Sequence, residues 1–250
     1  MGDPLILPPA PPKADAPAQV ATPITPAAAT DPAAATLPPA PPPPPPPARA
    51  GGKVTVLAKD GTTKPAEGAV VYLERVDPAL WKDRKRPPGG APKITMKEKR
   101  FDPRVLPVLV GRPVAFPNLD PIFHNVFSLT GNNKFDLGLY KDGKSQDHAF
   151  AEPGVVRMFC NIHPSMSAYV LVMQNPWWAS VAADGTYRLG DIPPGTWTLK
   201  VWHERGGESS REITVAAGQR LQADFELDGR KFKVVPHKNK LGKDYAQEGY

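Results

Sequence analysis

The chain has only one cysteine, Cys160, among its 250 residues. A single thiol cannot close an intrachain disulfide, and cysteine-rich zinc sites and iron–sulfur clusters need several thiolates. A copper centre with two cysteine ligands is excluded for the same reason. The five histidines are also too few for an enzyme that holds several copper ions. Any metal site in this chain is therefore expected to be mononuclear.

The sequence also lacks a long hydrophobic run. No segment reaches the roughly 18 apolar residues that a membrane-spanning helix needs, and the first residues, MGDPLILPPAPP, lack the basic and apolar parts of a signal peptide. We expect this sequence to begin after a removed export signal, because of the chemistry described below. The expected location is the periplasm or the cell surface.

The first 50 residues have too few apolar side chains to build a core. They hold 18 of the 34 prolines and 14 alanines, including the unbroken run Pro41–Pro47. Such a segment cannot bury enough apolar surface to offset the entropy lost on folding. We expect residues 1–50 to be a disordered Pro/Ala-rich spacer that holds the rest of the chain away from an anchor; binding to a polyproline-recognition domain is the alternative.

From residue 51 onward the pattern is strand-like, with short β-branched or aromatic runs between turn residues. The predicted strands are Lys53–Leu57, Ala69–Leu73, Pro113–Phe116, Asn125–Leu129, Val155–Phe159, Ala168–Met173, Thr186–Leu189, Thr196–Trp202, Arg211–Val215 and Arg220–Leu227. No long segment keeps a helical period, so the predicted fold class is all-β, with sandwiches or small barrels. Residues 76–92 are expected to form an exposed basic loop, and residues 229–250 a basic tail that wraps the surface or stays mobile.

Positive charge is concentrated in two stretches. The net charge is +6, and the first 50 residues carry −1, so the remainder carries +7. Eight lysines and arginines lie from Lys82 to Arg100, and six lie from Arg230 to Lys243. These stretches are either solvated surface or a docking surface for an acidic partner. Nucleic-acid binding is disfavoured, because no aromatic-interleaved binding motif accompanies the charge.

Three side chains of metal-binding type follow one predicted strand. Cys160, His163 and Met166 stand at i, i+3 and i+6, where a tight loop can turn all three toward one point. His124, 36 residues upstream and next to another strand, can supply a fourth donor. Two histidines, one cysteine and a distant axial methionine form the trigonal copper site of electron-transfer proteins.

Each of these residues also has an ordinary structural explanation: a buried cysteine as a small hydrophobe, a hydrogen-bonded histidine and a packed methionine. Their combination at this spacing favours the metal site. Cys–His catalysis fits less well, because residues this close in a hairpin loop leave little room for a substrate. We therefore expect a protein that is not an enzyme. His148 and His203 are expected to be hydrogen-bonded surface residues rather than ligands.

The segment 93–175 resembles a cupredoxin of the plastocyanin, pseudoazurin and amicyanin type. The matching motifs are Phe101-Asp-Pro, Val110-Gly111, Val114-Ala-Phe116-Pro-Asn118, His124-Asn125-Val126, Phe150-Ala-Glu-Pro153-Gly154 and Cys160-Asn-Ile-His163-Pro164-Ser-Met166. The resemblance implies a Greek-key β-sandwich that binds one copper ion through His124, Cys160 and His163, with Met166 as the axial ligand. It further implies that Asn125 ties the two ligand loops together and that Pro164 supports the site. Ser167-Ala168 stand where many relatives carry a glycine, which bears on the axial distance.

The flanking segments are similar to the two halves of a carboxypeptidase-regulatory-like, transthyretin-type β-sandwich. The motifs are Gly52-Lys-Val-Thr-Val, Gly68-Ala-Val-Val-Tyr-Leu73 and Asp184-Gly-Thr-Tyr-Arg-Leu-Gly-Asp-Ile-Pro-Pro-Gly195. Neither half alone has enough strands to bury a core. We therefore expect residues 51–75 to pair with residues 177–228, with the cupredoxin domain inserted between them. In the alternative, the first hairpin extends the cupredoxin sheet.

The expected function is an electron carrier that cycles between Cu(I) and Cu(II) with a redox partner such as a cytochrome or dehydrogenase. The basic stretch from Lys82 to Arg100 would favour an acidic partner. One alternative is a copper-binding module for sensing or delivery. Another is an envelope scaffold with a copper site that is not used for redox chemistry.

Overall fold

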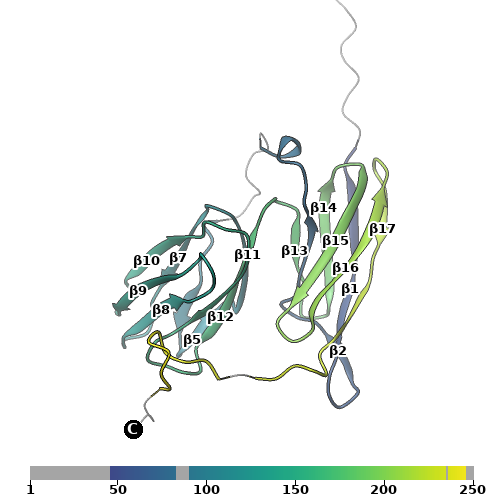
Figure 1. Cartoon of the computed structure of the whole chain (residues 1–250). Coiled ribbons are helices and arrows are strands. Elements are labelled where there is room, and N and C mark those ends of the chain that lie inside the picture. Colours follow the sequence, from purple (N-terminus) through teal and green to yellow (C-terminus); the bar gives the residue numbers. More distant parts are fainter. Residues whose placement is uncertain (1–45, 83–89, 235, 246–250) are drawn as a thin grey trace, which may run out of the picture. The chain divides into compact units, whose positions relative to one another are not determined.

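The computed structural model describes residues 46–82, 90–234 and 236–245. The described part is all-β, as predicted: it contains 18 strands and one short 3₁₀ turn, η1 (Pro78–Leu80) (Figure 1). Most of the expected spacer, residues 83–89 of the expected basic loop and the last five residues of the tail lie outside the described residues. No helix in the described ranges has the length and apolar character needed to cross a membrane.

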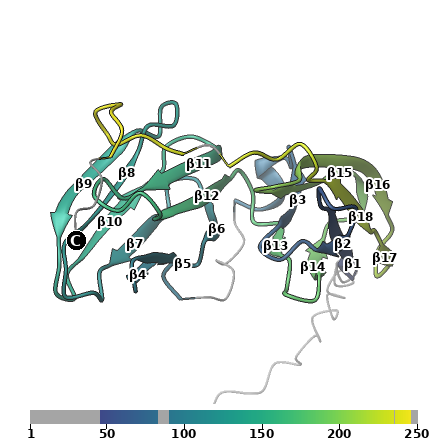
Figure 2. The same cartoon turned by 90° about the horizontal axis from the view of Figure 1, so that it is seen from below.

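One group of strands comes from the middle of the chain. Its five-stranded sheet runs in the order β6 (Val105–Leu109), β12 (Ser167–Met173), β11 (Gly154–Phe159), β8 (His124–Ser128) and β9 (Phe135–Tyr140). Two two-stranded sheets accompany it, β7 (Pro113–Pro117) with β10 (Ser145–Ala149) and the hairpin of β4 (Thr95–Lys97) with β5 (Arg100–Asp102). Figure 2 shows these strands from below. Their apolar faces enclose a core that includes Phe116, Phe150, Met158 and Val170 together with Cys160 and Met166.

The pairing of β8 with β11 places the two ligand-bearing segments next to each other. These strands are antiparallel neighbours, with Phe127 opposite Phe159. The start of β8 therefore lies beside the end of β11. His124 is the first residue of β8, and Cys160 directly follows β11.

A second group of strands joins the beginning of the described chain to its later part. The long strand β1 (Ala48–Leu57) pairs with β2 (Thr63–Pro65) and with three late strands, β14 (Thr186–Ile192), β17 (Arg220–Gln222) and β18 (Phe225–Asp228). The other sheet has the order β13 (Trp178–Ser180), β3 (Val70–Glu74), β15 (Gly195–His203) and β16 (Gly207–Val215). Among the described residues, β1 pairs with β2 and with three strands after residue 177, and β3 pairs with β13 and β15. Neither strand pairs with a strand of 93–175 in these ranges.

β1 and its late partner strands differ from the expected strands in two places. The strand begins at Ala48, five residues before the predicted strand and within the segment expected to be spacer. Gly52 is required by a close approach, because a Cβ there would lie 2.4 Å from the carbonyl oxygen of Ala223. The single strand predicted for 220–227 is two strands, since Asp224 turns its carboxylate to accept the N–H of Lys53 at 2.7 Å.

Candidate metal centre

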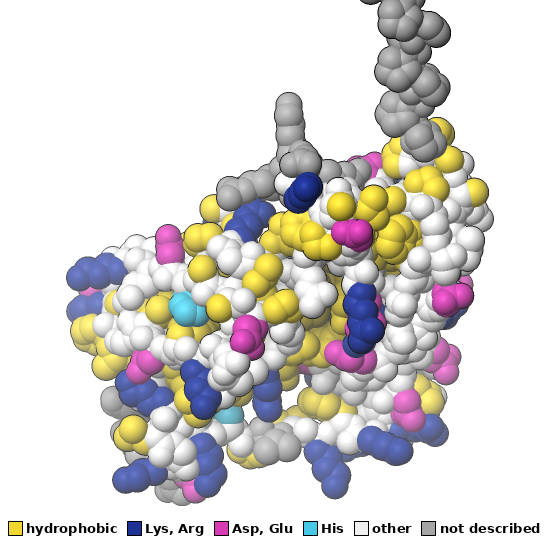
Figure 3. Space-filling model, turned by 45° about the horizontal axis from the view of Figure 1, so that its top comes forward, with side chains coloured by type: hydrophobic (Ala, Val, Ile, Leu, Met, Phe, Trp, Pro, Cys, Tyr) yellow, Lys and Arg dark blue, Asp and Glu magenta, His cyan; other side chains and the backbone are white. Residues whose placement is uncertain are grey.

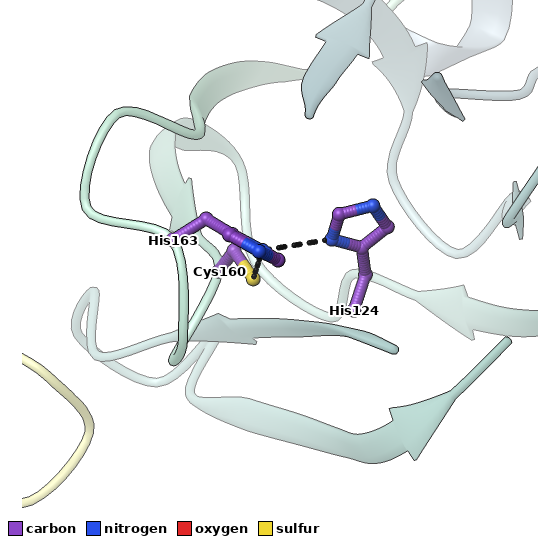
Figure 4. Close-up of side chains that lie close together, drawn as sticks. All are labelled: His124, Cys160 and His163. Atoms are coloured by element: carbon purple, nitrogen blue, oxygen red, sulfur yellow. Dashed lines mark hydrogen bonds between the residues drawn. The ribbon is translucent and has the colours of Figure 1, made fainter. Parts of the chain in front are cut away.

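Three side chains from two segments meet at one end of the middle sheet. The ligand atoms of His124, Cys160 and His163 all lie within 4.8 Å of one another. Nδ1 of His124 is 3.0 Å from Nδ1 of His163, which is 3.6 Å from Sγ of Cys160 (Figure 4). The structure therefore brings together the two histidines and the cysteine that the sequence singled out.

The loop from Cys160 to Met166 is closed by its own backbone. The N–H of Cys160 donates to the carbonyl of Met166 at 3.2 Å, and the N–H of Met166 donates to the carbonyl of His163 at 3.0 Å. Cys160 and Met166 are fully buried in the same apolar core, whereas His163 is partly exposed. Both ends of the loop thus lie in the interior, and its middle reaches solvent.

Asp120 holds His124 from the side opposite the cluster. Its Oδ2 lies 2.7 Å from Nε2 of His124. Because an ionised carboxylate only accepts hydrogen bonds, Nε2 carries the proton and Nδ1 is left free for a metal. Asp120 was not among the site residues expected from the sequence, although an aspartate four residues before a candidate ligand is a visible signal.

Asp120 also has two backbone donors. The turn between β4 and β5 has positive φ at Glu98 (53°) and Lys99 (56°), and the N–H groups of these residues donate to Asp120 at 2.8 and 3.0 Å. Burial of Asp120 raises the pKa of its carboxyl, but the hydrogen bonds from Lys99, His124 and Glu98 together outweigh burial and lower that pKa below its usual value. The carboxylate next to His124 is therefore ionised at neutral pH.

Asn125 makes different contacts from those that the resemblance implies. Its Nδ2 donates to Oδ1 of Asp136 at 2.6 Å and to the carbonyl of Gly138 at 2.9 Å. Both acceptors belong to β9, and the ladder between β8 and β9 is irregular between Asn125 and Phe127. The side chain therefore fastens β8 to β9, and its hydrogen bonds do not reach the Cys160–Met166 loop.

The remaining candidate histidines lie apart from this cluster. His148 stacks on Phe135 with ring centroids 4.0 Å apart, and His203 accepts the N–H of Gly206 at its Nδ1. Contrary to the expectation of a surface residue, His203 is buried. Burial lowers the pKa of both histidines, so each is held in its neutral form.

The donor set fits a copper ion. A thiolate is a soft ligand, and imidazole nitrogens suit both oxidation states of copper. The cluster supplies one thiolate, from Cys160, and two imidazoles, from His124 and His163, around a common point. Residues 161, 162, 164 and 165 include no carboxylate, so the ligand loop lacks the charged oxygen ligands that magnesium and calcium sites commonly use.

No family model matches this chain, and no curated protein matches it. Among solved structures, a purple cupredoxin from Nitrosopumilus maritimus is similar, with 26% identity over 33% of this chain and 99% of that chain, at a TM-score of 0.30. A reduced amicyanin variant is similar over 34% of this chain and 83% of that chain, with 25% identity and a TM-score of 0.32. An amicyanin variant in the Cu(I) form shows 24% identity over 34% of this chain and 85% of that chain, also at 0.32.

Proposed function

We propose that this protein is a mononuclear copper protein that carries single electrons between partners. The observation that carries the proposal is the convergence of His124, Cys160 and His163, whose ligand atoms lie within 4.8 Å of one another. The cupredoxin-like motifs in the sequence support the same function. A bound copper ion supplies one-electron redox chemistry.

The chain's own residues have separate roles in this proposal. His124, Cys160 and His163 would hold the ion, and Met166 would supply a weak thioether donor. Cys160 and His124 are buried and keep water from the site, whereas His163 is partly exposed and gives electrons a route to the surface. Asp120 fixes the tautomer and orientation of His124. Burial of the site reduces the solvent reorganisation that accompanies a change of charge.

Exposed apolar side chains in the ligand-bearing segments supply a docking surface for a redox partner. Leu119, Ile122 and Phe123 precede His124, and Ile162 precedes His163; each is more than a third exposed. The β4–β5 turn, which hydrogen-bonds to Asp120, adds Lys97, Lys99 and Arg100. Together they suit an acidic cytochrome or dehydrogenase.

On the face that Figure 3 shows, positive charge does not form a single block. Figure 3 shows lysine and arginine side chains at several places on the face in view, with acidic groups between them. Electrostatic attraction to an acidic partner would therefore come from local groups near the site. We expect it to weaken with salt, because the screening length is about 8 Å at physiological ionic strength.

We further propose that residues 51–75 and 177–228 form a carboxypeptidase-regulatory-like sandwich that is interrupted by the copper domain, residues 93–175. The pairing of β1 with β14, β17 and β18 supports this division. The proposed location is the periplasm or the cell surface, with the proline-rich segment as a spacer.

Titration of the metal-free protein with copper tests the function. One equivalent should produce an intense thiolate-to-copper absorption band in the visible range, and Cys160→Ser should abolish the band. A colourless copper adduct would contradict the electron-carrier proposal. An intense band without reversible reduction would favour a copper-binding or delivery module, and failure to take up copper would favour a scaffold.

A further inference from the structure

The C-terminal segment 236–245, here named the strap, lies on the loop that carries Cys160, His163 and Met166. We propose that the strap braces this loop in its metal-binding shape, with His237 and Tyr245 as positioning residues. This inference rests on the proposed function of the loop as a copper site. The bracing itself is a property of the chain without metal.

Three hydrogen bonds join the strap to the loop. Nε2 of His237 donates to the carbonyl of Pro164 at 2.7 Å, and the hydroxyl of Tyr245 donates to the carbonyl of Cys160 at 2.7 Å. The N–H of Lys240 donates to Oδ1 of Asn161 at 2.9 Å. The contacts are distributed over the first, second and fifth residues of the loop. They therefore restrain it along most of its length.

Aromatic packing adds a fourth contact beside Cys160. The ring of His237 stacks on Phe159, with centroids 4.1 Å apart and planes at 26°. Tyr245 meets the ring of His237 edge-on at 5.2 Å, and its hydroxyl lies 3.1 Å from Nδ1 of His237. Phe159 is the last residue of β11 and precedes Cys160. The rings of His237 and Tyr245 thus pack at the point where β11 ends and the Cys160–Met166 loop begins.

The strap also connects the loop to the segment that carries His124. The ammonium of Lys240 pairs with Asp136 of β9, and Oδ1 of Asp136 accepts the side-chain amide of Asn125. The backbone N–H of Lys240 meanwhile binds Asn161. A continuous chain of contacts therefore runs from the neighbour of His124 to the neighbour of Cys160. In this protein the strap extends the tie between the ligand segments that the resemblance implies for Asn125.

Bracing of this kind matters because a metal site is strongest when its ligands need not be reordered on binding. Without the strap, the carbonyls of Cys160 and Pro164 would bond to water, and the loop would gain conformations in which His163 points away from Cys160. Removal of residues that orient metal ligands typically costs about 10- to 100-fold in metal affinity. We expect the strap to act mainly on the rate at which copper leaves.

Hydrogen exchange in the full-length, metal-free protein tests the bracing directly. The amides of Cys160 and Met166 are both hydrogen-bonded within the loop. In the double variant His237→Ala, Tyr245→Phe, these amides should exchange about tenfold faster or more, because local opening then breaks fewer contacts. Matched controls are Lys243→Ala, on the strap, and Tyr169→Phe, in β12. Within the described residues, neither the Lys243 ammonium nor the Tyr169 hydroxyl makes a hydrogen bond or ion pair. The controls should leave the exchange unchanged.

The single variant Tyr245→Phe keeps the ring and removes only the hydroxyl, so it remains informative if the double variant unfolds. In copper-loaded protein, release of copper to a chelator should be about tenfold faster in the double variant than in the controls. Unchanged loop exchange in Tyr245→Phe and in the double variant would overturn the brace. If the wild-type protein takes up no copper, the proposed function fails, while loop exchange still decides the role of the strap.

Discussion

The carboxylate of Asp120 lies 2.7 Å from Nε2 of His124, the nitrogen that faces away from the proposed copper site. The same carboxylate accepts the backbone N–H groups of Glu98 and Lys99. Its orientation is therefore fixed by the β4–β5 turn and not by the histidine alone. A carboxylate that accepts the proton of Nε2 makes Nδ1 of the imidazole a more basic metal ligand. The Asp120–His124 pair should therefore favour the higher oxidation state of the metal.

Asp120→Asn should raise the reduction potential of the copper-loaded protein. The amide can still accept the proton of Nε2 but carries no negative charge, so Cu(II) is stabilised less than in the wild type. A 10- to 100-fold loss of Cu(II) affinity corresponds to about 60–120 mV. Redox titration followed by visible absorbance measures the shift. Asp142→Asn is the control, since Asp142 is an exposed partner of Lys141; equal shifts in both variants would contradict the role of Asp120.

Met166→Leu should raise the potential as well, through loss of a weak donor that stabilises Cu(II). The substitution conserves volume in a fully buried position, so the free energy of unfolding should fall by less than about 1.5 kcal/mol. The visible band should persist, because His124, Cys160 and His163 remain. Met158→Leu, in the same core but outside the loop, controls for packing. A potential that is equal in the two variants would exclude Met166 as the axial ligand.

The site was largely predictable from the sequence because its ligands fall close together in one loop. Cys160, His163 and Met166 need only a tight turn to approach one another, and His124 was found from its place at a strand. The hydrogen bond between Asp120 and His124 was not predicted, because two backbone N–H groups of the β4–β5 turn fix the orientation of Asp120. That turn lies far from Asp120 in the sequence. The contacts of His237 and Tyr245 were missed because the tail has no periodic pattern that would indicate which surface it covers.

The all-β class was predictable for a similar reason, since alternating apolar residues reveal strands whose two faces differ. Polar or interrupted strands were missed. β10, Ser-Gln-Asp-His-Ala, has little apolar character, and β9 contains Gly138 at a φ of 70°. The break of β17 and β18 at Asp224 depends on the partner strand, because β1 pairs with each of them in a different part of its length.

Gly52→Ala should destabilise the second group of strands without removing the copper band. The added Cβ would lie 2.4 Å from the carbonyl oxygen of Ala223, so β1 and the segment between β17 and β18 must separate. Overpacking of this kind typically costs about 1–3 kcal/mol. Gly190→Ala, in the neighbouring strand β14, meets nothing within 4 Å and is the control. Thermal unfolding by circular dichroism measures the effect; equal stability of the two variants would contradict the tight pairing of early and late strands.

The metal-free protein should lose stability as the pH falls through about 6.5 and below. Burial lowers the pKa of His203 and of His148 below the ordinary histidine value of about 6.5, so the unfolded chain binds protons in this range before the folded chain does. Stability therefore rises with pH between the folded and unfolded pKa values. Asp136, whose pKa is lowered from 3.8, contributes only in more acidic solution.

His203→Asn should reduce this pH dependence, since the amide oxygen can accept the N–H of Gly206 and has no proton to gain. Urea unfolding at pH 7.5 and pH 5 provides the comparison. Equal stability of the wild-type protein at pH 7.5 and pH 5 would contradict the predicted pH dependence. A variant that keeps the full pH dependence would show that His203 is not its source.

A redox cycle of the copper-loaded, full-length protein tests the central claim most directly. The account predicts that one equivalent of copper gives an intense visible band that disappears on reduction by one electron and returns fully on reoxidation. Cys160→Ser should show no such band at any potential. A wild-type protein that binds copper without this band, or loses the metal on reduction, would contradict the proposal that it carries electrons.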